Sequence, residues 1–256
     1  MNTKIISISN FKGGAGKTTV AVNLSFALST LGHKVLIIDS DMQMNTTHTL
    51  GKTQDVSNSI YHALTTESSF KGYIQKTKYK NLDIIISDYE MAYVDLEIFV
   101  KQQRETLIKR LLVDDEIKNY DFIILDTNPS LGLVTQNCLI AANYVLVPVE
   151  LSKYGIQGLA TLTRYFEKAI KQINKEFKLL GVVMNKVDNR KSVTIAGKEV
   201  IKKLFGDYLT DAFISTDANI ESAQWNDEPV LMYDKNSKSA KQFINLANEV
   251  IERVKD

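Results

Sequence analysis

Short apolar runs alternate along this chain with longer segments in which apolar residues recur at helical spacing. The runs are nearly continuous and rich in β-branched residues, which is typical of strands buried on both faces. Their alternation with helices predicts an α/β fold, a mostly parallel twisted sheet with helices on both faces. The predicted strands are residues 5–8, 35–38, 82–86, 122–125, 144–147 and 179–184.

Helices are expected at residues 18–31, 57–64 and 95–117 and at the end of the chain. The first of them ends before Gly32, a residue well suited to terminate a helix. Residues 45–81 otherwise consist of polar clusters and a basic stretch, for which a solvated face is the default interpretation. The basic stretch contains Lys71, Lys76, Lys78 and Lys80. We expect a single domain over residues 1–256.

The composition limits the class of protein. The chain has 256 residues, of which 44% are hydrophobic and 24% charged, enough to bury a sizeable core. Its net charge is only +1, so any binding to nucleic acid must come from a local patch. No apolar run approaches the ~18 residues of a membrane span, and the N-terminus has no signal-peptide pattern. We therefore expect a soluble, cytoplasmic protein.

Cysteine and histidine residues offer little metal chemistry in the sequence. The single cysteine, Cys138, excludes an internal disulfide and a cysteine-bound cluster within one chain, and is most simply a small core residue. The three histidines, His33, His48 and His62, have no metal-ligand spacing among themselves. Exposed or hydrogen-bonded histidines are expected rather than a metal site.

The segment between the first strand and the first helix has the composition of a phosphate-binding loop. It reads Phe11-Lys12-Gly13-Gly14-Ala15-Gly16-Lys17-Thr18-Thr19. Glycines let the backbone approach a phosphate chain closely, and a helix N-terminus turns free amides toward the anion. Lys17 would place its charge on the β- and γ-phosphates, and the Thr18 hydroxyl would ligate Mg²⁺. The generic P-loop has glycine where this chain has Phe11, so the loop is a deviant one. The alternative is a glycine-rich turn without a ligand.

The run from Lys12 to Thr19 resembles the P-loop of the ParA/MinD family of deviant Walker A ATPases. The resemblance implies that ATP and Mg²⁺ are the cofactors and that residues 12–19, Ala15 and Thr19 included, bind the nucleotide. It also implies that Lys12 reaches across a homodimer to the nucleotide of the facing subunit. Within the family, the small Soj-like partition proteins of plasmids or chromosomes are the most similar in pattern.

Acidic residues follow two of the predicted strands. The segment from Asp39 to Gln43 resembles the family's D-x-D-P-Q, with Met42 in place of proline. By that resemblance Asp41 orients the attacking water, and Asp39 supports the metal and phosphate region. Asp126 ends a strand in a Walker B arrangement and would hold the Mg²⁺ coordination sphere. After it, Asn128 stands where the family has a proline. The alternative for these residues is a set of acidic loop side chains without a ligand.

The last predicted strand is followed by Asn185-Lys186-Val187-Asp188. This N-K-x-D pattern is also the way in which many GTPases read guanine. In the ParA/MinD family an asparagine at the position of Asn185 usually contacts adenine. The lysine-rich deviant loop favours ATP, and GTP is the alternative.

Basic residues gather after this loop. Residues 186–203 contain six basic and two acidic residues, a local charge of six minus two, or +4. Paired across a dimer, this patch would suffice for salt-sensitive DNA binding without sequence preference. A solvated helix face is the alternative, and the arginines that small ParA proteins carry near residues 214–219 are missing. The candidate DNA contacts are Arg190, Lys191, Lys198, Lys202 and Lys203, with a second group at Lys235, Lys238 and Lys241.

The resemblance implies a partition ATPase that hydrolyses ATP slowly by itself. Its ATP-bound sandwich dimer would bind DNA nonspecifically on the nucleoid, and a ParB-like centromere-binding protein would stimulate hydrolysis. No membrane contact is expected, because the last residues look like the closing helix of the fold. The alternative is a MinD-like, nucleotide-dependent positioning scaffold that does not bind DNA.

Overall fold

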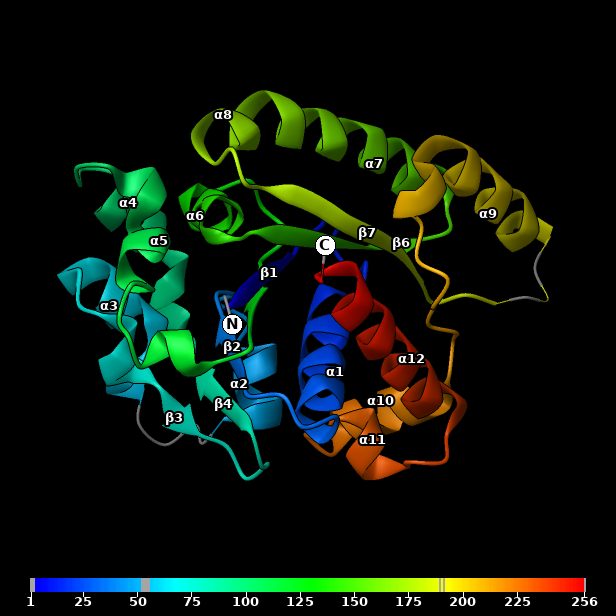
Figure 1. Ribbon diagram of the computed structural model, residues 1–256, viewed down its shortest axis with the longest axis horizontal. Coiled ribbons are helices and arrows are strands. Elements are labelled where there is room, and N and C mark those ends of the chain that lie inside the picture. Colours follow the sequence, from blue (N-terminus) through cyan, green and yellow to red (C-terminus); the bar gives the residue numbers. More distant parts are fainter. Residues whose placement is uncertain (1–2, 52–55, 189, 191, 256) are drawn as a thin grey trace.

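The strands of the protein form one twisted sheet with the order β3-β4-β2-β5-β1-β6-β7 (Figure 1). In this computed structural model, residues 3–51, 56–188, 190 and 192–255 are described. All neighbouring strands are parallel except β3, which runs antiparallel to β4. The strands are β1 (Lys4–Ile8), β2 (Val35–Asp39), β3 (Gln75–Lys76), β4 (Leu82–Ile85), β5 (Phe122–Asp126), β6 (Tyr144–Glu150) and β7 (Lys178–Asn185). The six predicted strands and the parallel α/β sheet are confirmed.

Helices cover both faces of the sheet (Figure 1). On one face lie α1 (Lys17–Thr30), α10 (Ala218–Trp225), α11 (Val230–Tyr233) and α12 (Lys238–Arg253). The other face carries α3 (Ile60–Thr66), α4 (Val94–Ile98), α5 (Leu107–Leu111), α6 (Leu133–Ala141) and α7 (Lys153–Tyr165). A π-helical turn (Phe166–Ile170) continues α7 into α8 (Lys171–Ile173). The remaining helices are α2 (Asn45–Leu50), which follows β2, and α9 (Ser192–Phe205), which follows β7.

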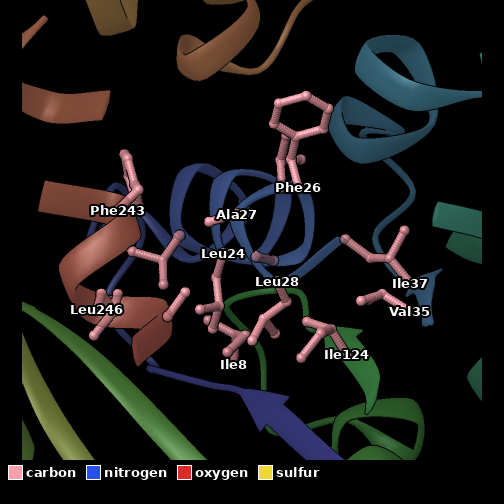
Figure 2. Packing of buried hydrophobic residues seen from close by; sticks show 14 of the residues in the cluster. Ile8, Leu24, Phe26, Ala27, Leu28, Val35, Ile37, Ile124, Phe243 and Leu246 are labelled. Carbon is pink, nitrogen blue, oxygen red and sulfur yellow. The ribbon is translucent and has the colours of Figure 1, made fainter. Parts of the chain in front are cut away.

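The alternation of side chains along β2 shows why its first four residues are all apolar. Val35 and Ile37 pack under α1, whereas Leu36 and Ile38 pack under the helices of the opposite face. Figure 2 shows the first of these layers, in which Leu24 and Leu28 of α1 meet the strands. A strand between two helical layers has no solvent-facing side, so positions 35–38 are apolar and only Asp39, at the carboxyl end of the strand, is charged.

Helix α1 is buried along nearly its whole length, because α12 packs beside it (Figure 2). Gly32 ends it as predicted, with a φ of 96° that a residue with a side chain rarely adopts. The amide of Gly32 donates to the carbonyl of Ser29. The helix that starts at the phosphate loop is thus held in place by its packing against α12 and the sheet, and it ends at a defined residue.

The single outer helix predicted at 95–117 is wrong. The chain there forms α4, a 3₁₀ turn (Arg104–Thr106), α5 and a second 3₁₀ turn (Ile117–Asn119). Gln103 has a φ of 51°, which breaks the helix, and Arg104 bonds the carbonyl of Phe99. Two short helices bury Ile98 and Leu107 against the sheet, and a straight helix would turn one of these groups toward solvent.

Of the other predicted features, one helix and the buried cysteine are confirmed, and one short strand was not predicted. The helix near 57–64 is present as a 3₁₀ turn (Val56–Asn58) and α3. The basic stretch after it contains β3, which the sequence did not indicate. Cys138 is buried as expected. Among the described residues, no helix is both long and apolar enough to cross a lipid bilayer.

Candidate functional site

Residues 9–16 connect β1 to α1 and form the predicted phosphate loop. Gly14 and Gly16 have φ angles of 74° and 88°, in the region that glycine adopts without strain. Lys17, Thr18 and Thr19, the first turn of α1, line an open cavity. The unpaired amides of this helix end are therefore available to an anion in the cavity.

The end of β7 packs directly on the loop. The side-chain amide Nδ2 of Asn185 donates to the carbonyl of Ala15 at 2.9 Å. A Cβ atom added to Gly16 would collide with that same amide. Position 16 is thus restricted to glycine both by its backbone angle and by Asn185.

The cavity has a volume of about 670 Å³, within the range of small-molecule sites. Most of the predicted nucleotide-binding residues line it. Lys12 and Ala15 do not, and Asp39 and Asp126 lie buried behind it. The predicted residues on its surface are Gly13, Gly14, Gly16, Lys17, Thr18, Thr19, Asp41 and Asn185.

The parallel register of β2 and β5 places Asp39 beside Asp126. Both carboxylates are fully buried. Asp39 Oδ2 accepts from the amide and hydroxyl of Thr47 at 2.8 and 2.7 Å, and its Oδ1 accepts from the amide of Asp41 at 3.1 Å. Asp126 Oδ2 accepts from the Thr46 hydroxyl at 2.8 Å. The two threonines of α2 therefore hold the two acids that the sequence predicted.

Burial raises the pKa of both acids. The pKa of Asp126 rises to about 7 through loss of solvent and the nearby charge of Asp39. The Thr46 and Thr18 hydroxyls lower this pKa and offset part of the rise. The pKa of Asp39 rises to about 6, again mainly through burial. Burial also lowers the pKa of Lys17, although the charges of Asp126 and Asp41 act to raise it. Burial thus disfavours the charged forms of both acids and of Lys17 alike.

The residues at this point fit a magnesium ion. Asp126 Oδ1 is buried and has no hydrogen-bond partner in the structure, and a buried carboxylate oxygen without a partner is costly. The hydroxyl of Thr18 is near enough to lower the pKa of the same carboxyl. Hard oxygen ligands of this kind are the ones that Mg²⁺ prefers.

The raised pKa values predict a pH dependence for the protein without nucleotide and metal. Unfolded aspartates ionise near pH 4, but the folded protein keeps protons on this pair up to about pH 6 to 7. As the pH rises through that window, the unfolded state has already lost the protons that the folded state must still release. The contribution of the pair to stability is therefore complete below pH 4 and lost by about pH 7.

The variant Asp126→Asn removes one of the two buried charges. At pH 8 in EDTA we expect its free energy of unfolding to rise by roughly 2 kcal/mol or more, about 4–8 °C in melting temperature. At pH 4 the gain should vanish. Thermal unfolding followed by circular dichroism at both pH values measures this, with the exposed Asp211→Asn as control. A variant that melts at or below the wild-type temperature at pH 8 would contradict the argument.

Lys12 does not point into the cavity. Its Nζ lies 2.6 Å from Glu150 Oε2 and 3.2 Å from the hydroxyl of Ser152. Glu150 ends β6, and Ser152 caps α7. In the isolated chain the lysine is therefore held at the junction of β6 and α7, one third exposed.

Asp188 of the N-K-x-D segment is engaged by Arg190. The Arg190 Nε donates to Asp188 Oδ1 at 2.9 Å and its Nη2 to Asp188 Oδ2 at 3.0 Å. Reading guanine requires both carboxylate oxygens to accept from the base. Asp188 does not line the cavity at the phosphate loop, which disfavours that function.

The predicted DNA contacts lie along α9 and just before it. Lys202 and Lys203 are exposed. The Nζ atom of Lys198 lies 4.6 Å from the centre of the Phe213 ring. Arg190 is exposed although it pairs with Asp188, and Lys191 lies outside the described residues. Arg190 and Lys238 line a common hollow of about 360 Å³, so the two basic groups meet there. Lys235, Lys238 and Lys241 are exposed.

Several residues at the site were missed from sequence. Thr46 and Thr47 follow the predicted acidic loop, and their proximity to it was the only signal. The wall formed by α10 and the residues on either side of it was also missed, because nothing in the sequence indicates that this segment, 205 positions from Thr19 at Gln224, lies beside the loop. There, Gln224 Nε2 donates to the Thr19 hydroxyl at 2.9 Å. Four acids also line this wall, namely Asp217, Glu221, Asp227 and Glu228.

The fold and the loop define a nucleotide-binding protein of the P-loop class. A family model described as an AAA domain matches residues 3–179. The chain is 36% identical to the sporulation initiation inhibitor protein Soj of Bacillus subtilis, over 96% of this chain and 98% of Soj. It is 32% identical to the chromosome partitioning protein ParA of Caulobacter vibrioides, over 99% and 96%. The septum site-determining protein MinD of Pyrococcus horikoshii, solved with Mg-ADP, superposes with a TM-score of 0.79 at 27% identity, covering 99% of each chain.

These matches extend over almost the whole chain. The protein therefore belongs to the ParA/MinD family of P-loop ATPases, within the group of Soj-like partition proteins. The resemblance drawn from Lys12 and the deviant loop is confirmed.

Proposed function

We propose that this chain is a DNA partition ATPase whose ATP-bound dimer binds DNA nonspecifically and whose hydrolysis is stimulated by a centromere-binding partner. The observation that carries the proposal is the relation to Soj and ParA over nearly the full length of all three chains. The phosphate loop with Lys12 and Lys17 adds to it, because a second lysine is not needed to bind a nucleotide in a monomer. The protein would act in the cytoplasm, on the nucleoid.

The nucleotide is proposed to be ATP with Mg²⁺. Lys17 and the amides of the loop would hold the phosphates, and Asn185 would lie beside the base. Thr18 and Asp126 would hold the metal, with Asp39 supporting them. When bound, the metal neutralises charge on the β- and γ-phosphates. The solved MinD relative carries Mg-ADP, and Asp188 lies outside the cavity lining, which supports adenine over guanine.

Hydrolysis would depend on Asp41. Its carboxylate lines the cavity near the loop, and its Oδ1 is oriented by the amide of Gln43 at 3.0 Å. That position suits a group that orients the attacking water. In the isolated chain Lys12 is held by Glu150, so a site that needs Lys12 from a facing subunit is incomplete in the monomer. We therefore propose that turnover is slow in the monomer, and that the partner stimulates it in the dimer.

The variant Lys12→Ala tests whether Lys12 contributes to the ATP-bound dimer. We expect ATP-induced dimerisation to weaken by at least about tenfold, because one charge-assisted contact per site is lost. The affinity of the monomer for nucleotide should change much less, since Lys12 does not line the cavity. Analytical ultracentrifugation with ATP measures the dimer, with Lys175→Ala as control. An undiminished dimer in Lys12→Ala would refute the role across the interface.

DNA binding is proposed to use the exposed lysines of α9. Lys202→Glu with Lys203→Glu reverses two charges per subunit, four per dimer. If all four contact phosphates, the slope of log affinity against log salt should flatten by about 3 to 4 units. ATP binding should persist, because neither lysine lines the cavity.

The measurement is fluorescence anisotropy with random-sequence duplex DNA over a salt series, with ATP and without nucleotide. Lys175→Glu with Lys178→Glu, exposed and at the far end of β7, is the charge-matched control. Wild-type DNA binding that requires ATP and is lost in the α9 variant supports the partition function. Wild-type affinity and slope in that variant would exclude this surface.

A second candidate function has one observation in its favour. The segment from Ile214 to Asn219 contains no arginine, although it lies next to the hollow where Arg190 and Lys238 meet. A positioning scaffold without DNA affinity, like MinD, would not need one. No ATP-dependent DNA binding by the wild-type protein would favour this function over partition.

A further inference from the structure

A second cluster of metal-ligating side chains lies outside the cavity, between α3 and the segment that follows β4. It consists of His62, Asp88 and Glu90. His62 Nδ1 lies 3.8 Å from Asp88 Oδ2, and His62 Nε2 lies 3.9 Å from Glu90 Oε2. One ligand atom from each of the three residues can be chosen so that all lie within 4.8 Å of one another. No spacing among the histidines predicted this, because two of the three ligands come from a distant segment.

The cluster is built around a buried carboxylate. Asp88 is 1% exposed, and its Oδ1 accepts from the amide of Glu90 at 2.7 Å. Its Oδ2 accepts from the hydroxyl of Ser59, whose oxygen also lies 3.0 Å from His62 Nδ1. These contacts fix the carboxylate and the imidazole relative to each other before any ligand arrives.

The charges of the cluster are not balanced by the described protein. Within 4.0 Å of the two carboxylates, the described residues supply a single basic side chain, His62. A neutral imidazole would leave two negative charges together, one of them out of solvent, which is costly. A bound cation would offset both. His62 and Glu90 are each more than one third exposed, so a cation can reach them from solvent.

We propose that His62, Asp88 and Glu90 bind a divalent transition metal ion of the zinc type. One imidazole nitrogen with two carboxylates is a donor set for such ions, whereas Mg²⁺ and Ca²⁺ take oxygen ligands. Bonds of about 2.0–2.2 Å would bring the three ligand atoms roughly 3.5 Å apart. The exposed side chain of Glu90 can supply that small closure, and water can complete the coordination.

The place of the cluster gives the metal a structural consequence. Ser87, next to Asp88, donates its amide to the Thr47 hydroxyl at 2.9 Å, and Thr47 holds Asp39. The amide of Ile60 in α3 also bonds the carbonyl of Ile86. A metal that joins α3 to residues 88 and 90 would therefore fix the segment that supports the nucleotide site, and would stabilise the fold.

The test is Zn²⁺ binding to the full-length, nucleotide-free protein in excess Mg²⁺. We expect isothermal titration calorimetry to give one Zn²⁺ per chain and Zn²⁺ to raise the melting temperature. His62→Gln and Glu90→Gln should each weaken binding by at least about tenfold and remove the rise, since each deletes a ligand. The Glu90 side chain is 43% exposed, so its variant should fold normally.

Two controls separate this site from others. His33→Gln removes a histidine that faces a single carboxylate, Asp121, at 3.7 Å, and should bind Zn²⁺ like the wild type. Asp126→Asn should do the same, because it changes only the nucleotide site. No Zn²⁺ uptake by the wild type, equal uptake by His62→Gln, or loss of uptake only in Asp126→Asn would each overturn the proposal. These outcomes are independent of DNA binding and of ATP turnover.

Discussion

Lys17→Ala is expected to abolish nucleotide binding. Lys17 is 6% exposed, lines the cavity and is the one lysine there at the first turn of α1. Its loss removes charge-assisted bonds to the phosphates worth about 3 kcal/mol or more, at least a roughly 100-fold loss of affinity. It also removes the cation that attracts Asp126 and Asp41.

A fluorescent ATP analogue, titrated in Mg²⁺, measures this affinity. The exposed Lys34→Ala serves as the control for loss of a lysine as such. Circular dichroism should show that Lys17→Ala is folded, because its removal also relieves a buried charge. Binding within about threefold of wild type, well short of a tenfold step, would contradict the assignment of the phosphate site.

Asp41→Ala is expected to separate binding from turnover. Asp41 is 9% exposed at the cavity, and its amide supports Asp39 through a bond that alanine keeps. ATP binding and ATP-induced dimerisation should therefore persist. Loss of the group that orients the water should lower turnover by roughly 10²- to 10⁴-fold.

Phosphate release under multiple turnover measures the loss, and sedimentation with ATP measures the dimer. Asp207→Ala, an exposed acid away from the cavity, is the control. Wild-type turnover in Asp41→Ala would remove its catalytic role. Loss of ATP binding in the same variant would instead place Asp41 among the residues that hold the nucleotide.

The sequence was sufficient wherever a function depends on neighbours in the chain. The apolar runs identified the parallel strands, because strands buried on both faces are mostly apolar. The loop from Lys12 to Thr19 identified the family, since its glycines, lysines and threonines stand at consecutive positions, from which we propose that they act on one ligand. Asp39 and Asp126 were found as acids at the ends of such strands, and the register of β2 with β5 brings them together.

The tertiary structure decided whatever depends on residues far apart in the chain. The broken outer helix follows from burying Ile98 and Leu107 on one sheet face, which helical spacing alone does not specify. The contact of Lys12 with Glu150 joins residues 138 positions apart. The wall of α10 reaches Thr19 over 205 positions.

The same distinction applies to the two clusters of acids. Asp39 and Asp41 could be read from a short motif, whereas His62 meets Asp88 and Glu90 only because α3 packs beside the end of β4. Packing of that kind is set by the shapes of whole elements, not by a local pattern. The sequence by itself therefore determined the fold class, the family and the phosphate loop. The folded chain alone decided which distant side chains share a site.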